Sequence, residues 1–385
     1  MKCAKAKTRS VLLPALTFYA ALNCAQASAG MKFVHPGAVH NKADLDFVAG
    51  KIASNAQPWT GKFNALLALA TPYAKGTAPL DGFEDDQKAD AIKAYANALA
   101  WYYTGKTNTN YAGAAKNVLN TWATTFKGYA VPPAGTGNQS QLNAAWIGAL
   151  MGSAAEIMRE DKTWSKAEIR ALQKMFTQKF YPALNQMSPW NGNVDLTQID
   201  AIMNLAVFNE DEAEFNLGLT RLTARNPNYF YLSTDKGIDY SNWFKPVKMI
   251  DGLGQESCRL GDPGKAADNG HHMQFAMAST FRAAEVAWNQ GVDYYGANAT
   301  RYTAMLELLA KQEVTGSMQG ACSDDATNID LFDTFEIGYN HYHNRKGMNL
   351  PNTAAIIAST RTKKSDWNIF YESLTHGGLP AKSSR

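Results

Sequence analysis

Cysteine is scarce in this sequence of 385 residues, which contains only Cys3, Cys24, Cys258 and Cys322. So few cysteines exclude the dense disulfide framework of small secreted domains. No second pair of cysteines stands at the spacing of zinc ligands. The adjacent His271 and His272 also lack the separation of four residues that places two histidines on one face of a zinc-binding helix. We therefore expect neither a metal nor another cofactor.

A long apolar run is missing, apart from residues 11–25 near the start of the chain. This run is short for a membrane anchor and is interrupted by Pro14. Basic residues precede it and the small residues ASA follow at 27–29, which is the layout of a secretory signal peptide. We predict a signal over 1–29 and a secreted or periplasmic mature chain over 30–385. Cys24 leaves a lipoprotein signal as the alternative, although Asn23 fits that pattern poorly.

A strong excess of one charge is also missing. The formal net charge is +3, and removal of the four basic residues in the signal changes it to −1. The mature chain therefore lacks the basic field that nucleic acid or an anionic membrane would require. Cys258 and Cys322 are then the remaining cysteines, and two cysteines in an oxidising compartment usually pair. We predict a disulfide between them.

Strand-like alternation is scarce, and its clearest instance is the short segment 229–232. Apolar residues instead recur at helical spacing, without heptads or a strict repeat. This pattern predicts successive antiparallel helix pairs in a single domain, an all-α (α/α) toroid, with an ordinary helical bundle as the alternative. The predicted helices are 84–103, 111–122, 142–159, 167–181, 197–208, 212–222, 273–289 and 302–311.

Three polar segments are candidates for a functional site, because loops on a rigid scaffold often carry function. The first is PWNGNVD at 189–195, which leads into a helix and contains Trp190, Asn191 and Asn193. These residue types suit a turn and a helix cap. Their amides could equally donate hydrogen bonds to a substrate carboxylate.

The second segment contains Gln255, Glu256 and Arg259, followed by a glycine-containing stretch and the histidines His271 and His272. Adjacent histidines at a helix start point about 100° apart, so at most one faces a given site. A lone histidine is more often structural, but this pair follows an arginine and a carboxylate in a polar loop.

The third segment, FEIGYNHYHNR at 335–345, contains Tyr339, His341, Tyr342 and Arg345. If it is helical, Tyr339 shares a face with Tyr342, and Arg345 lies about one turn beyond Tyr342. Such a concentration of donors suggests function, whereas buried tyrosines and histidines with one partner each are the structural alternative.

These residue types suit β-elimination on a uronate polymer. That reaction needs a donor to neutralise the carboxylate, a base for the C5 proton and an acid for the leaving oxygen. Amide, arginine, histidine and tyrosine side chains can supply these roles without a metal. One tyrosine can serve as base and acid when the proton and leaving oxygen lie on the same side, as in mannuronate. Guluronate and glucuronate need a second group on the opposite side.

Several motifs resemble those of secreted alginate-lyase-type proteins. They cover most of residues 33–360 and comprise FVHPG at 33–37 with ADL at 43–45, NGNVDL at 191–196, QES at 255–257 with the later histidine, AEVAWNQG at 284–291, and YNHY at 339–342 with Arg345 and Gly347. The sequence is most similar to polysaccharide lyase family 38 and more distantly to the family 5 alginate lyases. The resemblance implies an (α/α) toroid that cleaves alginate or glucuronan, an acidic polysaccharide.

The resemblance also implies roles for individual residues. Asn193 would neutralise the carboxylate, His271 would be the base, Tyr339 the acid or shared acid and base, and Arg345 would polarise the site beside the tyrosine. Family 5 enzymes have an Asn-His pair where this chain has Gly192-Asn193, so the histidine must come from elsewhere. The choices between His271 and His272 and between Tyr339 and Tyr342 stay open. Predicted substrate-binding residues are Trp190, Asn191, Gln255, Glu256, Arg259, His272, His341 and Tyr342.

Two other functions fit the same scaffold. A glycoside hydrolase would use paired carboxylates, such as Asp195 or Asp200 with Glu256. A non-catalytic glycan-binding protein would use its tryptophans as sugar platforms. The sequons at Asn138 and Asn298 matter only in a eukaryotic host.

Overall fold

Polar caps set where the long helices of this chain begin. Asn138 caps α5 (Gln139–Met158) in a capping box, and Asn191 caps α8 (Gly192–Asn209) by accepting from the Val194 amide. Such oxygens satisfy amides that have no partner within the first helical turn. The computed structural model of the protein describes residues 30–71, 84–260, 270–327, 331–361 and 371–381, without the side chains of 84–86.

The chain divides into two units, Met1–Lys32 and Phe33–Arg385, and the helices belong to the second unit. The predicted signal over 1–29 lies outside the described residues. The remaining helices are α1 (Lys42–Ala53), α2 (Trp59–Leu67), α3 (Glu84–Tyr103), α4 (Thr109–Thr125), α6 (Lys166–Met175), η1 (Phe176–Phe180), α7 (Tyr181–Asn185), α9 (Glu212–Tyr229), α10 (His271–Asn289), α11 (Tyr294–Ala297), α12 (Ala299–Thr315), α13 (Glu336–Tyr339), η2 (Asn340–Arg345), α14 (Pro351–Thr360) and α15 (Glu372–Thr375).

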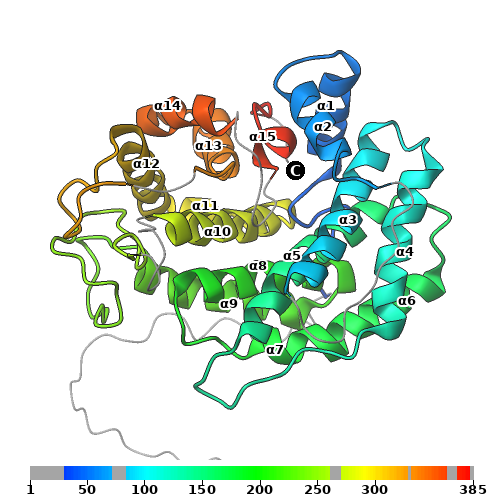
Figure 1. Ribbon diagram of the computed structural model, residues 1–385, viewed down its shortest axis with the longest axis horizontal. Helices are drawn as coiled ribbons and strands as arrows, with labels where there is room; N and C mark the ends of the chain where they lie inside the picture. Colours follow the sequence, from blue (N-terminus) through cyan, green and yellow to red (C-terminus); the bar gives the residue numbers. More distant parts are fainter. Residues whose placement is uncertain (1–29, 72–83, 261–269, 328–330, 362–370, 382–385) are drawn as a thin grey trace, which may run out of the picture. The chain divides into compact units, whose positions relative to one another are not determined.

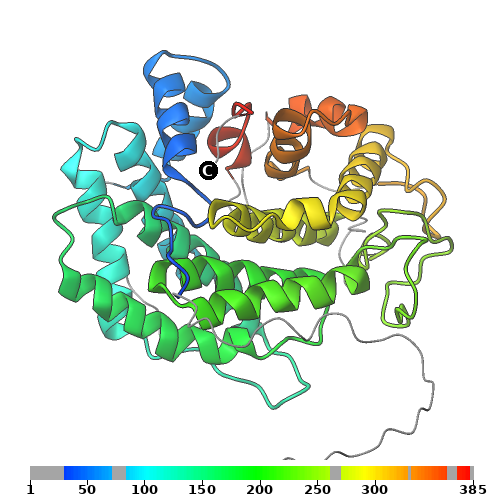
Figure 2. The same cartoon turned by 180° about the vertical axis from the view of Figure 1, so that it is seen from behind.

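An inner row of helices runs α3, α5, α8, α10, each packed against the next (Figures 1 and 2). Residues of α5 from Gln141 to Met158, and of α8 from Gly192 to Phe208, are buried without interruption. A helix buried on all sides must be covered by other elements. On α9 the buried residues from Phe215 to Tyr229 instead recur every three or four positions, which is the pattern of an outer helix. Helices α4 and α6 pack together in the outer layer, at the edge of the ribbon in Figure 1.

Neighbouring inner helices are parallel. Thr197 of α8 contacts Ser279 of α10 through their hydroxyls at 3.0 Å, and Arg282 Nε donates to Asp200 Oδ2 at 2.8 Å; both pairs are 82 residues apart. On the other side, Val194 packs with Leu142 of α5, and Ser153 Oγ donates to Asn204 Oδ1. The N-terminal ends of α5, α8 and α10 therefore lie at the same end of the row.

The predicted all-α toroid is confirmed, and only isolated β-bridges occur among the described residues. The predicted strand at 229–232 is wrong. Helix α9 continues to Tyr229, and Phe230 N donates to Asn226 O. Residues 229–231 do form backbone hydrogen bonds with 252–255, such as Tyr231 N to Leu253 O at 2.8 Å, but these amount to one isolated bridge, Phe230 with Gly254, and not to a strand. The periodic burial of α9 extends to Tyr229, so this residue packs as part of the helix and not as part of a strand. No helix in the described part of the chain is long and apolar enough to cross a membrane.

Candidate functional site

The starts of α8 and α10 are joined by the segment 254–259. Gly254 lies directly against α10, since a Cβ atom there would come within 1.9 Å of Met273 Sδ. The next residues contact α8: Gly192 N donates to Gln255 Oε1 at 2.5 Å, and Asn193 N donates to Glu256 Oε2 at 2.8 Å. The first two predicted polar segments therefore meet at one end of the inner row.

Glu256 is the centre of this group. Its side chain is 1% exposed and accepts from Asn193 Nδ2 at 3.0 Å as well as from Asn193 N. Arg259 Nη1 lies 3.2 Å from Glu256 Oε1, and its guanidinium stacks over Phe244. The helix N-terminus and the arginine both supply positive charge, which compensates the buried carboxylate. Predicted site residues Asn193, Gln255, Glu256 and Arg259 are thus brought together.

Less buried side chains lie at the same end of the inner row. Trp190 is 46% exposed and rests on Gly137, where a Cβ would come within 2.5 Å of the indole Nε1. Asn191 is partly exposed, as are His271 and His272, whose ring centroids lie 5.2 Å apart. His271 also packs edge-on to Phe275 and to Phe332 at 4.9 Å each. Sequence reasoning missed Phe332, because nothing in the chain around it marks contact with α10. These accessible groups and the Glu256 cluster form the candidate site.

The third predicted segment supplies a different, buried group. The side chain of Arg345 is 2% exposed and forms a two-fold ion pair with Glu285, at 2.7 and 3.0 Å. His341 stacks on Tyr295 at 3.8 Å between centroids, and Tyr342 donates to the Tyr295 carbonyl. Arg345, His341 and Tyr342 therefore pack within the protein, which is the structural alternative weighed for them.

Burial sets the ionisation of this group. Burial lowers the pKa of His341 to about 4 and raises that of Tyr342. For Glu285, burial alone would raise the pKa, but the adjacent Arg345 brings it below its usual value. At neutral pH the pair is charged and His341 is neutral.

Tyr339 lies apart from the starts of α8 and α10. Its neighbour Gly338 abuts Phe281, which is ten residues along α10 from His271, a rise of about 15 Å. Tyr339 stacks on His343 at 4.6 Å. Burial and the nearby Glu336 raise the pKa of its hydroxyl. The structure does not bring Tyr339 or Arg345 to the Asn193 group.

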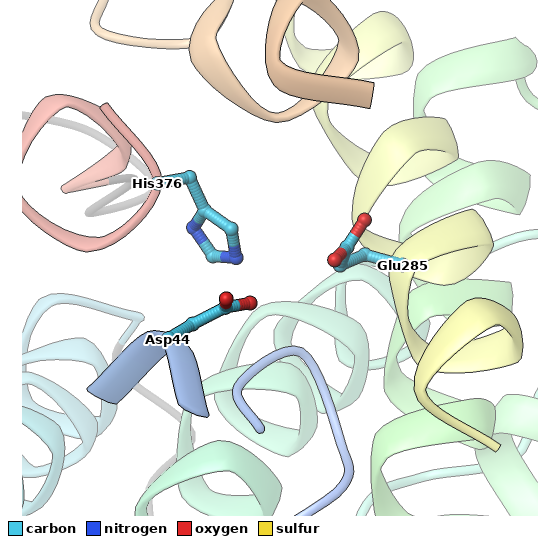
Figure 3. A group of neighbouring side chains, drawn as sticks. All are labelled: Asp44, Glu285 and His376. Atoms are coloured by element: carbon cyan, nitrogen blue, oxygen red, sulfur yellow. The ribbon is translucent and has the colours of Figure 1, made fainter. Parts of the chain in front are cut away.

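One group among the described residues could offer three metal ligands: Asp44, Glu285 and His376, whose ligand atoms lie within 4.8 Å of one another. Figure 3 shows the imidazole and the two carboxylates pointing toward one another. Sequence reasoning missed this group, because its members come from α1, α10 and the end of α15. Arg345 already pairs with Glu285 and lies 3.8 Å from Asp44, and His376 Nε2 lies 3.2 Å from the Val39 carbonyl. A cation here would meet the guanidinium and displace a hydrogen-bonded histidine.

Chelator treatment should therefore leave the protein unchanged. We expect the same melting temperature and the same activity before and after dialysis against EDTA, because Arg345 supplies the positive charge that the carboxylates of this group require. The measurement is thermal unfolding with and without EDTA, followed by readdition of Ca²⁺, Mg²⁺ or Zn²⁺. A melting temperature that falls with EDTA and recovers with one ion would identify a metal site.

The predicted disulfide between Cys258 and Cys322 is confirmed. It attaches the segment 254–259 to the loop after α12, where Trp243, Leu253 and Met318 form a small apolar cluster with Cys322. The bond closes a separation of 64 residues. It therefore restrains the part of the chain that holds Gln255 and Glu256 against α8.

Loss of this bond should destabilise the protein and the site together. For Cys258→Ser with Cys322→Ser we expect a loss of about 2–4 kcal/mol in the free energy of unfolding, because the unfolded chain regains loop entropy. Activity should fall at temperatures where the rest of the protein stays folded. Denaturant unfolding and activity of the double variant, compared with the parent under reducing and oxidising conditions, test this. Equal stability in all samples would show that the bond is dispensable.

No protein-family model matches the sequence. No curated protein matches it either. Solved structures do. Alginate lyase A1-III from Sphingomonas species A1 has a TM-score of 0.56 at 14% identity, over 82% of this chain and 91% of that one. A tyrosine-to-phenylalanine variant of alginate lyase A1-III complexed with tetrasaccharide gives 0.58 at 15% identity, over 84% and 90%.

An alginate lyase from Bacteroides ovatus gives a TM-score of 0.57 at 15% identity, over 89% of this chain and 99% of that one. At these identities the likeness concerns the fold, and it does not distinguish family 38 from family 5. This chain therefore has the helical-toroid fold of solved alginate lyases.

Proposed function

We propose that this protein is a secreted or periplasmic polysaccharide lyase that cleaves β-linked uronate polymers, alginate or glucuronan, by metal-independent β-elimination. The observation that carries the proposal is the group at the starts of α8 and α10. It combines amides, an arginine and two partly exposed histidines on a fold shared with alginate lyases.

The reaction assigns a task to each part of the group. An amide at the start of α8, together with Arg259, would stabilise the negative charge that builds on the carboxylate as the C5 proton leaves. His271 would take that proton. The C4–O bond then breaks, its electron pair goes to the leaving oxygen, and the C4=C5 double bond forms. The rings of His271 and His272 lie 5.2 Å apart, close enough to serve one site, although the sequence led us to expect only one histidine there; His272 would protonate the leaving oxygen.

The carboxylates considered for a hydrolase already form ion pairs and hydrogen bonds within the protein. Asp195 is buried and accepts from Arg221, Arg225 and Tyr229 at 2.7 to 3.0 Å. Asp200 accepts from Arg282 and Asn204, and Glu256 from Asn193 and Arg259. A hydrolase needs one protonated carboxyl group that reaches the glycosidic oxygen. These buried, ion-paired carboxylates favour the lyase over the hydrolase.

A single assay with two readouts tests the proposal. The mature protein is incubated with alginate, glucuronan and a neutral glucan, and ultraviolet absorbance and reducing ends are recorded together. A lyase produces absorbance and reducing ends in step, on the uronate polymers only. Reducing ends without absorbance would indicate a hydrolase. Neither signal, with retained affinity for the polymers, would indicate a glycan-binding protein.

A further inference from the structure

The amide of Asn193 is fully engaged within the protein. An asparagine amide carries two N–H donors. Asn193 Nδ2 donates to Glu256 Oε1 at 3.0 Å and to Asn191 Oδ1 at 3.1 Å. The residue is only 3% exposed. The two carboxyl oxygens of Glu256 accept from Asn193 N and Asn193 Nδ2, and Arg259 Nη1 lies 3.2 Å from one of them, so this side chain holds the NH₂ group of Asn193 toward itself. Asn193 therefore has no amide hydrogen left for a substrate carboxylate in this arrangement.

Asn191 is oriented in the opposite sense. Its Oδ1 accepts from Val194 N at 3.3 Å, as the cap of α8, and from Asn193 Nδ2 at 3.1 Å. Two donors at the oxygen fix the amide plane and turn its NH₂ group away from the helix. No described group accepts from Asn191 Nδ2, and the side chain is partly exposed.

We propose that Asn191 Nδ2 is the amide donor that binds the substrate carboxylate, and that Asn193 and Glu256 are positioning residues which aim it. The inference rests on the proposed lyase function and identifies which amide performs the neutralising step. Glu256 fixes Asn193, Asn193 fixes the oxygen of Asn191, and the NH₂ group of Asn191 is thereby preorganised. A donor held in place stabilises the charge that develops on the carboxylate without reorganising during the reaction.

The test distinguishes the role of Asn191 as the cap of α8 from its role as a hydrogen-bond donor to the substrate. Asn191→Asp and Asn191→Ser both keep a side-chain oxygen for the Val194 amide, so the melting temperature should stay near that of the parent. Both remove the NH₂ group. We expect turnover on the uronate polymer to fall about 10²–10³-fold, the usual cost of removing one preorganised donor. The matched control is Asn108→Asp, at the cap of α4, where Asn108 accepts from the Asn110 amide. It should leave turnover unchanged.

A methyl-esterified substrate distinguishes a donor from a structural residue, because a purely structural defect would lower activity equally on the acid and on the ester. Methyl esterification removes the charge on the carboxyl group, so the penalty of Asn191→Asp should shrink to less than about tenfold on the ester, while the penalty on the acid persists. Glu256→Gln should show the same selectivity with a smaller loss in kcat and an unchanged KM, since its effect passes through Asn193. Equal losses on acid and ester would overturn the assignment, and so would full activity of both Asn191 variants.

Failure of this inference differs from failure of the proposed function. A parent protein that releases no unsaturated product from any uronate polymer would refute the lyase. A parent that is active, with Asn191→Asp equally active and Asn193→Ala inactive at normal stability, would return the donor role to Asn193.

Discussion

Replacement of His271 by alanine should abolish cleavage of guluronate and glucuronate linkages while the protein stays folded. His271 is at the first position of α10, beside the segment that contacts α8, and the residue is partly exposed. Removal of a general base typically costs about 10²–10⁴-fold in turnover. The loss should be smaller on mannuronate linkages. There the C5 proton and the leaving oxygen lie on the same side, so the group that protonates the leaving oxygen, His272 in the proposed reaction, can also serve as the base.

His343→Ala is the matched control for that experiment. His343 is exposed, and its Nδ1 lies 2.8 Å from the Met348 carbonyl, away from the start of α10. Its removal should change neither turnover nor melting temperature. The measurement is the initial rate of absorbance increase on polymers of defined composition, with thermal unfolding in parallel. If His271→Ala keeps its rate while His272→Ala loses it, the base is His272.

Replacement of Arg345 by methionine should unfold or severely destabilise the protein. The guanidinium lies in the interior, paired with Glu285 at 2.7 Å and near Asp44, and stacked over Trp288. Its removal leaves the carboxylate of Glu285 buried without a counter-charge. Breaking a buried ion pair from one side typically costs about 3–5 kcal/mol. The free energy of unfolding, measured by denaturant titration, should fall by that amount.

A double variant distinguishes a structural role for Arg345 from a catalytic one. Arg345→Met with Glu285→Gln removes both charges, so much of the lost stability should return, along with activity. The single variant Glu285→Gln is the matched partner in this cycle. A single Arg345→Met variant that is as stable as the parent but inactive would contradict this account and restore the catalytic role implied by the resemblance.

Local sequence determined most of the helices. The predicted 84–103 has the bounds of α3, and the predicted 142–159 and 273–289 differ from α5 and α10 by no more than three residues at each end. Apolar periodicity and caps act over neighbouring residues, so a sequence displays them directly. At 229–232 the same signals failed. Four residues are too few to distinguish the alternation of a strand from the last turn of the preceding helix. The pairing of Cys258 with Cys322 also followed from the sequence, since few cysteines remained.

Tertiary structure decided which polar segments share a site. By sequence, Arg345 and Tyr339 look as promising as Asn193, because all stand in segments dense with donors. The parallel packing of α8 and α10 brings Asn193, Glu256 and His271 to one end of the inner row. The same packing encloses Arg345 against Glu285 near the other end of α10. Donor density is a local property, whereas exposure and convergence depend on contacts between residues 60 or more positions apart. A sequence names the groups capable of chemistry, and only the packing of its helices determines which of them can reach a substrate.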